Sequence, residues 1–359
     1  MTVTDLTFEQ SKNNPCITGG IHTWECFETL LRLFALVTAI LCLVSVANAE
    51  SFNGSGLKKL AVVDPVDSRP MEAVVFYPSA AKTEATKIGP YQVQASPTAP
   101  MAEGRFPLIL LSHGNMGSMW GHHDLGTSLA RNGYIVVSVT HPGDNFKDPS
   151  RLGAVSSTYG RPMQISAALT AALDEAALAP HIDKDRIGFA GFSAGGTTGL
   201  ILAGAKPDLS RFEAYCAKRP DDHSVCEAEG KIRNDRPDLA PQADPRISAY
   251  VLMAPLSVIF GAETLKSVTA PTLIYVGDQD GELSPQENAM ALAPELPKAQ
   301  LQVIEKAGHF TFLAPCSEEL TKLVAGFCID NPGIVRTALH QRMNAEIATF
   351  FEKNLEKLN

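Results

Sequence analysis

Short apolar runs alternate with helical patterns along most of the chain, and this alternation constrains the fold more than any other feature. Runs that are apolar on both faces predict strands at residues 72–77, 107–111, 134–140, 186–190, 247–253, 272–276 and 300–305. Apolar periodicity between them predicts helices at residues 123–132, 162–177, 195–204, 286–296 and 333–355. This order predicts an α/β protein with a doubly wound, mostly parallel sheet and right-handed crossovers.

The composition is that of a globular chain with a large core. Of the 359 residues, 45% are hydrophobic and 19% are charged, with 27 glycines and 24 prolines. These proportions exclude a disordered chain, a collagen-like repeat and a coiled coil. The net charge of −9 argues against nucleic acid or an anionic membrane surface as the main partner.

The N-terminal segment, residues 1–49, is predicted to be a secretory signal. Residues 33–47 are continuously apolar, follow Arg32 and lead into Ala47-Asn48-Ala49, which has the small residues that a signal peptidase requires. We expect cleavage after Ala49, which leaves residues 50–359 secreted or periplasmic and without a stable membrane partner. Because residues 1–28 are long and acidic for such a segment, an uncleaved membrane anchor and a buried helix remain alternatives.

Four cysteines follow the predicted cleavage site: Cys216, Cys226, Cys316 and Cys328. An even number of cysteines in an exported chain favours disulfides, and we expect the short-loop pairing of Cys216 with Cys226 and of Cys316 with Cys328. Free buried thiols are the alternative. No two cysteines have the C-x-x-C spacing, so a zinc or thioredoxin-like site has little support.

Two segments interrupt the alternation. Residues 206–246 are charged and rich in proline, and their length predicts a cap or lid inserted after the helix at 195–204. Residues 79–104 are rich in Ala, Pro, Lys and Thr without periodicity, which predicts a surface excursion between two early strands.

The most specific motif joins a predicted strand to a predicted helix through Gly191-Phe192-Ser193-Ala194-Gly195. The two glycines allow strand and helix to pack closely, so that the serine lies at the tip of a tight, strained turn. The helix N-terminus behind the serine stabilises developing negative charge. The motif therefore predicts Ser193 as a nucleophile, and a plain glycine-rich turn is the structural alternative.

A serine nucleophile needs a base, and in this kind of sheet the acid and then the histidine follow the serine along the chain. His309 follows the last predicted strand in a loop that contains Gly308, at the sheet edge where ligands bind. His340 lies inside the C-terminal helix, where a packing or solvent role is expected. We therefore expect His309 to be the base.

The acid should follow the strand at 272–276, where Asp278 and Asp280 are both candidates. A carboxylate in this loop would hold the imidazole and stabilise its protonated form. Reach beyond the strand end favours Asp280, whereas Asp278 suits capping of its own turn. The residues alone do not decide whether Asp278 or Asp280 is the acid.

Two backbone N–H groups should form an oxyanion hole. One is expected from Ala194, and the other from Asn115 in the loop after the strand at 107–111, with Met116 as the rival. Gly114 and Gly117 are expected to let this backbone turn inward.

Met116, Trp120 and Phe192 are expected to contact the substrate, although ordinary core positions are an equal alternative. The pair His122-His123 has no third ligand at a suitable spacing, so packing histidines are expected rather than a metal site. The chemistry needs no metal and no organic cofactor.

These residues carry a family resemblance. Residues 57–357 resemble the α/β-hydrolase superfamily, and most of all predicted dienelactone hydrolases and bacterial relatives of platelet-activating-factor acetylhydrolase. The resemblance is carried by Ser-His-Gly-Asn at 112–115, His-Pro-Gly-Asp-Asn at 141–145, the stretch from Asp183 to Gly196, Gly-x-x-Asp at 277–280 and Ala-Gly-His at 307–309. It implies the α/β-hydrolase fold and the triad Ser193, Asp280 and His309, with Pro285 supporting Asp280. True dienelactone hydrolases use a cysteine nucleophile, so this serine makes dienelactone itself a doubtful substrate.

The sequence therefore predicts a secreted serine hydrolase that cleaves small-molecule carboxylic esters through an acyl-enzyme. A serine peptidase of the same fold is the alternative, although such enzymes usually add a large propeller domain. A non-catalytic binding module would be expected to lack a triad member. The natural ester and the oligomeric state are not predicted.

Overall fold

The computed structural model describes residues 52–226 and 231–355, and its centre is one large β-sheet. Within these residues the sheet has eight strands in the order β1-β2-β6-β5-β7-β8-β9-β10. Their bounds are β1 Gly54–Val63, β2 Pro70–Ser79, β5 Phe106–Ser112, β6 Ile135–Val139, β7 Ile182–Phe192, β8 Ala249–Met253, β9 Thr272–Gly277 and β10 Ala299–Ile304.

The direction of the strands sets where the loops lie. β1 and β2 pair antiparallel, as do β2 and β6, whereas β6, β5, β7, β8, β9 and β10 are parallel to one another. The carboxyl ends of β5, β7, β9 and β10 therefore lie at one edge of the sheet. The mostly parallel, doubly wound sheet predicted from the sequence is present.

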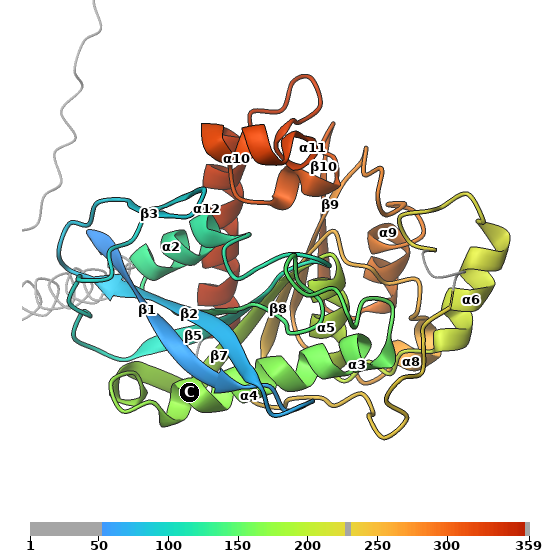
Figure 1. Ribbon diagram of the computed structural model, residues 1–359, viewed down its shortest axis with the longest axis horizontal. Coiled ribbons are helices and arrows are strands. Elements are labelled where there is room, and N and C mark those ends of the chain that lie inside the picture. The colour runs from blue at the N-terminus through green and yellow to red at the C-terminus, as the bar shows by residue number, and fades with distance from the viewer. Residues whose placement is uncertain (1–51, 227–230, 356–359) are drawn as a thin grey trace, which may run out of the picture. The chain divides into compact units, whose positions relative to one another are not determined.

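Helices cover both faces of the sheet (Figure 1). The bounds of the longer helices are α2 His123–Arg131, α4 Gly160–Asp174, α5 Ala194–Leu202, α6 Leu209–Lys218 and α12 Arg336–Asn354. Leu108 and Leu110 of β5 belong to the core cluster that contains α4 and α5, and Ile109 and Leu111 to the cluster that contains α2 and α12. Successive side chains of a strand point to opposite faces, so the apolar run of β5 fills both cores.

The excursion at 79–104 is more ordered than the sequence indicated. It contains a small two-stranded sheet of β3 Thr86–Ile88 and β4 Tyr91–Val93. Val93 and Ala95 are fully buried in the core cluster on the α2 and α12 face. The segment is therefore partly a core element, which its lack of periodicity concealed.

The segment 206–246 begins with α6 and is tied to the body of the protein. Phe212, Cys216 and Val225 are buried in the core cluster beside α4 and α5. Ser156 Oγ, in the short helix α3 Val155–Thr158, donates to Asp235 Oδ2 at 2.5 Å.

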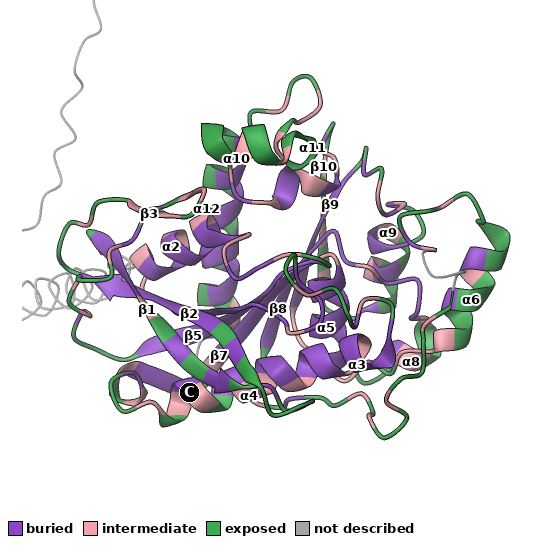
Figure 2. Ribbon diagram, viewed as in Figure 1, coloured by how far each residue is buried: buried purple, intermediate pink, exposed green. Residues whose placement is uncertain are grey.

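Both expected disulfides are present, Cys216 with Cys226 and Cys316 with Cys328. The second closes the segment that contains the short helices α10 Glu318–Leu323 and α11 Ala325–Cys328, where none of the helical residues is buried (Figure 2). Two disulfides are typical of an oxidising, extracellular location.

The predicted signal segment and its cleavage site lie outside the described residues. Among the helices that the structure describes, none is long and apolar enough to cross a bilayer.

Candidate active site

Ser193 occupies a sharp turn between β7, which ends at Phe192, and α5, which begins at Ala194. Its backbone has φ 54° and ψ −117°, a region that non-glycine residues rarely adopt. Backbone hydrogen bonds hold it there, since Ser193 N donates to Met253 O at 2.9 Å and Ser193 O accepts from Gly196 N at 2.8 Å. The strained turn that the motif predicted is therefore present.

Close backbone packing explains the glycines on either side of this turn. A methyl group on Gly191 would overlap the carbonyl of Gly195, and a methyl group on Gly195 would overlap the carbonyl of Ser112. Strand, turn and helix meet backbone to backbone, and only glycine fits at these two positions.

His309 and Asp280 are joined by a hydrogen bond. His309 Nδ1 and Asp280 Oδ2 lie 2.7 Å apart, and both residues are buried. The other carboxylate oxygen, Oδ1, accepts from the N–H groups of Glu282 at 2.9 Å and Leu283 at 2.8 Å. Asp280 is thus fixed at both oxygens, with one turned to the imidazole.

Asp278, the rival acid, has a different role. It is exposed, and its Oδ1 accepts from Lys306 N at 2.6 Å, which ties the loop after β9 to the loop after β10. Of the two aspartates, Asp280 is the one that contacts His309.

The loop that carries His309 is a short 3-10 helix, His309–Phe312, that is tied down from several sides. The His309 ring packs against Phe192, with ring centroids 4.8 Å apart, and Gly308 N donates to Thr311 Oγ1 at 3.1 Å. Phe310 packs against Phe327, which lies in the segment closed by the second disulfide, at 4.5 Å between centroids. The position of the imidazole therefore depends on both neighbouring segments.

His340 supports this loop from α12, which agrees with the packing role that was one of the two expected for it. Its Nδ1 lies 2.6 Å from Asp124 Oδ2 and its Nε2 lies 2.8 Å from Thr311 O. Both partners are acceptors, so both ring nitrogens donate and the imidazole is protonated. Burial lowers the pKa of His340, but Asp124 and the Thr311 carbonyl together raise it by more, so the pKa is above its ordinary value.

The loop after β5 places Asn115 and Met116 at the same edge. Met116 N donates to Asp144 Oδ1 at 3.0 Å, so this N–H is already occupied. The N–H groups of Asn115 and Ala194 have no acceptor among the described residues. Both amides that the sequence predicts for the oxyanion hole are therefore available to a ligand.

The glycines of this loop act differently from what the sequence indicated. The positive φ falls on Met116, at 58°, and not on Gly114 or Gly117. A methyl group on Gly114 would meet the Phe192 ring, and one on Gly117 would meet His113. Both glycines provide close approach rather than a left-handed turn.

His113 has a structural role in this loop. Its Nδ1 donates to Gly114 O and its Nε2 accepts from His141 N at 3.0 Å, which is the pattern of a neutral imidazole. Burial, and then the nearby Arg161 charge, lower the pKa of His113 to about 3.

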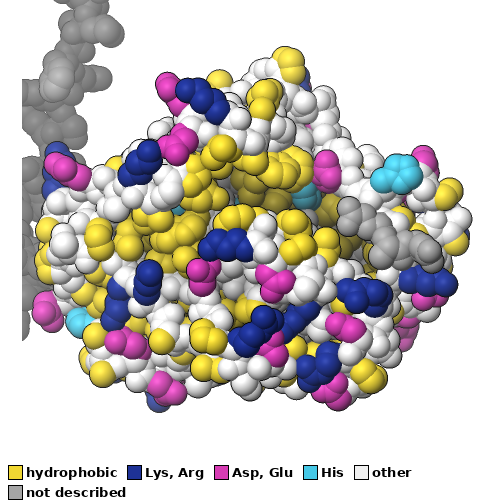
Figure 3. Space-filling view, in the orientation of Figure 1, with side chains coloured by type: hydrophobic (Ala, Val, Ile, Leu, Met, Phe, Trp, Pro, Cys, Tyr) yellow, Lys and Arg dark blue, Asp and Glu magenta, His cyan; other side chains and the backbone are white. Residues whose placement is uncertain are grey.

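A cavity of about 390 Å³ opens onto Ser193, Ala194, Asn115 and His309. Its other walls are mainly apolar and include Phe212, Val225, Ile232, Leu256, Ile259 and Phe327. Figure 3 shows hydrophobic side chains gathered around a hollow on this face of the molecule, below the α10–α11 segment. The cap thus supplies part of the wall, through Phe212, Val225 and Ile232.

Of the three expected contact residues, Met116 and Phe192 line this cavity and Trp120 does not. Placing Trp120 there was wrong. Its ring packs edge-on against Phe76 of β2, with centroids 6.3 Å apart, and it lies half-buried against the core cluster that contains α2. An aromatic residue close to the loop in sequence is therefore no guide to the cavity wall.

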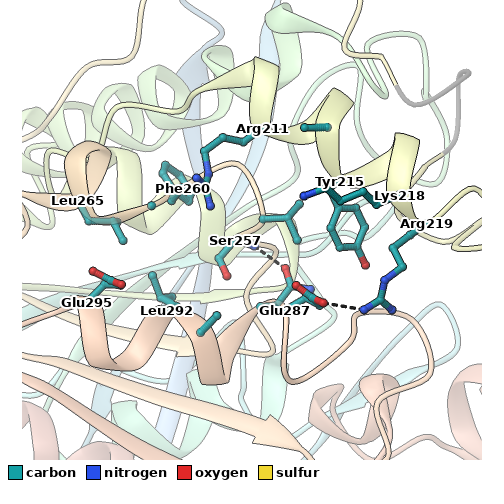
Figure 4. Close-up of a pocket in the computed structure, with 15 residues that line it drawn as sticks. Arg211, Tyr215, Lys218, Arg219, Ser257, Phe260, Leu265, Glu287, Leu292 and Glu295 are labelled. Carbon is teal, nitrogen blue, oxygen red and sulfur yellow. Dashed lines mark hydrogen bonds and ion pairs between the residues drawn. The ribbon is translucent and has the colours of Figure 1, made fainter.

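A second cavity, of about 320 Å³, lies between α6 and the helices α8 Ala262–Leu265 and α9 Ala289–Leu292. Figure 4 shows the α6 side chains at its wall, with Arg219 forming an ion pair with Glu287 at 2.6 Å. Neither Ser193, Asp280 nor His309 lines it, whereas Ser193 and His309 line the first cavity.

His122 and His123 are buried, and their rings pack against Phe192 and Tyr91 respectively. Burial lowers the pKa of both, that of His122 to about 4. No group of three His, Cys, Asp or Glu side chains suited to a metal ion occurs in the described ranges.

Comparison with known proteins agrees with this architecture. Residues 124–328 match the model of the prolyl oligopeptidase family. A ferulic acid esterase from Streptomyces cinnamoneus has a similar fold, with a TM-score of 0.59 and 20% identity over 86% of this chain and 92% of that chain. No curated protein matches the chain significantly. The α/β-hydrolase fold implied by the sequence motifs is confirmed, whereas the narrower likeness to dienelactone hydrolases and platelet-activating-factor acetylhydrolases gains no support.

Proposed function

Since the chain belongs to the prolyl oligopeptidase family of α/β hydrolases, we propose that it is a secreted serine hydrolase that cleaves carboxylic esters. The observation that carries the proposal is the set of side chains at one cavity. Ser193 lies in a strained turn there, beside a His309 whose Nδ1 is bonded to Asp280 at 2.7 Å. A serine with a base that is itself oriented by an acid is the arrangement for acyl transfer.

In the proposed reaction, Ser193 Oγ attacks the acyl carbon while His309 Nε2 takes the serine proton. The N–H groups of Asn115 and Ala194 hold the oxygen that becomes negative. His309 then gives the proton to the departing alcohol, and Asp280 stabilises the imidazolium in the meantime. Water, activated by the same imidazole, releases the acid and restores Ser193.

Ester rather than peptide cleavage is supported by the character of the cavity. Its walls are mainly apolar, and its charged lining residues are Lys231, Glu282 and Arg161, of which Arg161 is paired with Asp144 at 2.7 Å. An apolar acyl chain or an aromatic acid fits such walls. Secretion is supported by the two disulfides, and by the signal segment at 1–49 that the sequence predicts.

The family match favours one further candidate, a serine peptidase, because the family model describes oligopeptidases. The two activities use the same residues and differ in the leaving group.

The test compares p-nitrophenyl acetate, butyrate and octanoate with methyl ferulate and with an aminoacyl p-nitroanilide. The aromatic ester is included because the similar structure is a ferulic acid esterase. The proposal expects kcat/KM for the best ester to exceed that for the anilide by about three orders of magnitude or more. Faster cleavage of the anilide than of the esters would support the peptidase. No cleavage of any of the five substrates would indicate a binding module.

A further inference from the structure

A buried ion pair lies behind the loop that carries Asn115. Arg161, in the first turn of α4, donates from Nη1 to Asp144 Oδ2 at 2.7 Å, and the two side chains are only 3% and 1% exposed. Asp144 comes from the loop after β6. The pair thus joins two elements that are distant in sequence from the Asn115 loop and lie against it.

Each partner of the pair holds one flank of Asn115. Asp144 uses its other oxygen, Oδ1, to accept the Met116 N–H at 3.0 Å. Arg161 Nη2 donates to the carbonyl of His113. The backbone is therefore held on both sides of Asn115, which lines the cavity and whose N–H has no acceptor among the described residues.

The bond to Asp144 also accounts for the unusual backbone of Met116. A non-glycine residue at φ 58° persists only where its surroundings hold it there. With Met116 N turned toward Asp144, this N–H cannot face the cavity. Of the two residues of this loop that line the cavity, Asn115 and Met116, Asn115 is therefore the one whose N–H can complete the site with Ala194 N.

Stability alone does not explain such a pair. A buried ion pair contributes little net stability compared with apolar side chains of similar volume. Burial raises the pKa of Asp144, but the surrounding groups, Arg161 first and then the Met116 N–H, together lower it by more, so its pKa is below the ordinary value. The carboxylate is therefore charged in the neutral range and can accept from the Met116 N–H, from Arg161 and from Ser157 Oγ.

We propose that Asp144 and Arg161 are positioning residues for the oxyanion hole, which hold residues 113–116 so that the Asn115 N–H faces the oxygen that gains charge. This role rests on the proposed function. It acts on the transition state, because a preformed donor stabilises the oxyanion more than it stabilises the uncharged carbonyl. Loss of the pair should therefore lower kcat and leave KM almost unchanged.

The test measures kcat and KM for p-nitrophenyl butyrate, together with inhibition by two ketones of the same shape. An alkyl trifluoromethyl ketone forms a tetrahedral oxyanion with the serine, and the matching methyl ketone binds without this adduct. For Asp144→Ala we expect kcat and the affinity for the trifluoromethyl ketone to fall by about 10²-fold, as for loss of one oxyanion donor. KM and the affinity for the methyl ketone should change by less than about threefold.

Asp144→Asn is the more conservative variant, because it keeps the volume of the side chain. It keeps an oxygen acceptor for the Met116 N–H but leaves Arg161 without its counter-charge. We expect a loss of roughly tenfold in kcat and the same selective loss of trifluoromethyl ketone affinity. If Asp144→Ala does not fold, the ratio of the two ketone affinities in Asp144→Asn decides the matter.

Asp244→Asn is the matched control. Asp244 is 5% exposed and pairs with Arg246 at 2.5 Å, but it precedes β8 and so lies at the sheet edge opposite Ser193. This variant should lose thermal stability without a change in kcat or in the ratio of the ketone affinities.

The positioning role is overturned if Asp144→Ala loses affinity equally for both ketones, or if its kcat stays within threefold of the wild-type value. Failure of the proposed function looks different, because the wild-type protein would then neither hydrolyse the ester nor bind the trifluoromethyl ketone more tightly than the methyl ketone. That outcome removes both proposals.

Discussion

His309 turns its Nδ1 toward Asp280 Oδ2 across 2.7 Å, and this bond decides which imidazole nitrogen is left for the cavity. An ionised carboxylate only accepts hydrogen bonds, so Nδ1 carries the proton and Nε2 carries the lone pair. A base that takes a proton from Ser193 must present that lone pair. The residue that sets the tautomer, Asp280, thus lies 29 residues from His309 in sequence.

Exchanging the acid for its amide tests this bond. Asp280→Asn should lower kcat by about 10³–10⁴-fold, because asparagine favours the wrong tautomer while the geometry is preserved. Asp278→Asn is the matched control, since Asp278 binds Lys306 N and not His309. Steady-state kinetics on a p-nitrophenyl ester measures both, and a larger loss in the Asp278 variant would assign the acid to that residue.

Removing the nucleophile tests the centre of the proposal. Ser193→Ala should fold normally and lose roughly three or more orders of magnitude in ester turnover, and what remains comes from binding and the oxyanion hole. A fluorophosphonate should label wild-type protein at Ser193, which peptide mapping by mass spectrometry detects. Labelling at another serine would refute the assignment.

The pH dependence of stability tests the pair of His340 and Asp124. The pKa of His340 is raised in the folded state, so its contribution is complete below about pH 6.5, the unfolded value, and is lost as the pH rises through the folded value. His340→Gln should therefore reduce the free energy of unfolding by about 3 kcal/mol at pH 6, and by less at alkaline pH.

Urea unfolding between pH 5 and 9 measures this difference. His223→Gln is the control, because His223 is exposed. A difference between His340→Gln and wild type that is constant across the range would mean that the imidazole is neutral in the folded protein.

The two disulfides should affect different steps. Replacing Cys316 and Cys328 by alanine frees the segment whose Phe327 packs on Phe310, next to His309, so kcat should fall. Replacing Cys216 and Cys226 frees the cap, whose Phe212 and Val225 line the cavity, so KM should rise.

Each pair of replacements removes about 3 kcal/mol of stability in the chain-entropy model. In wild type, reduction should lower activity before circular dichroism records a loss of secondary structure. Simultaneous loss of activity and structure would contradict this independence of the two segments from the sheet.

The sequence located most of the parallel strands because their residues are apolar on both faces, as the fully buried β5 illustrates. It missed β1, where the alternation of an edge strand is blurred by Lys58 and Lys59. An antiparallel strand at the edge of a sheet has one half-exposed face, so its pattern is weaker.

The site was predictable to the extent that local motifs encode it. Ser193 and His309 stand in turns that their neighbours define. Asp144 was visible only as part of the motif at 141–145, and Arg161 carried no signal, since their roles depend on contacts between the loop after β6, α4 and the Asn115 loop. Trp120 was misplaced for the same reason, because packing against Phe76 is a long-range contact.

The cap leaves and re-enters the body of the protein at almost the same point. Leu202, the last residue of α5, accepts a hydrogen bond at 2.9 Å from the N–H of Asp244, where the chain returns toward β8. The two ends of this insertion of some forty residues are therefore close together, and a short loop could join α5 to β8 in its place. Exchanging the cap for a segment of another protein would therefore change which substrates enter the cavity without moving the reacting groups. The new segment would need apolar side chains at the places of Phe212 and Val225.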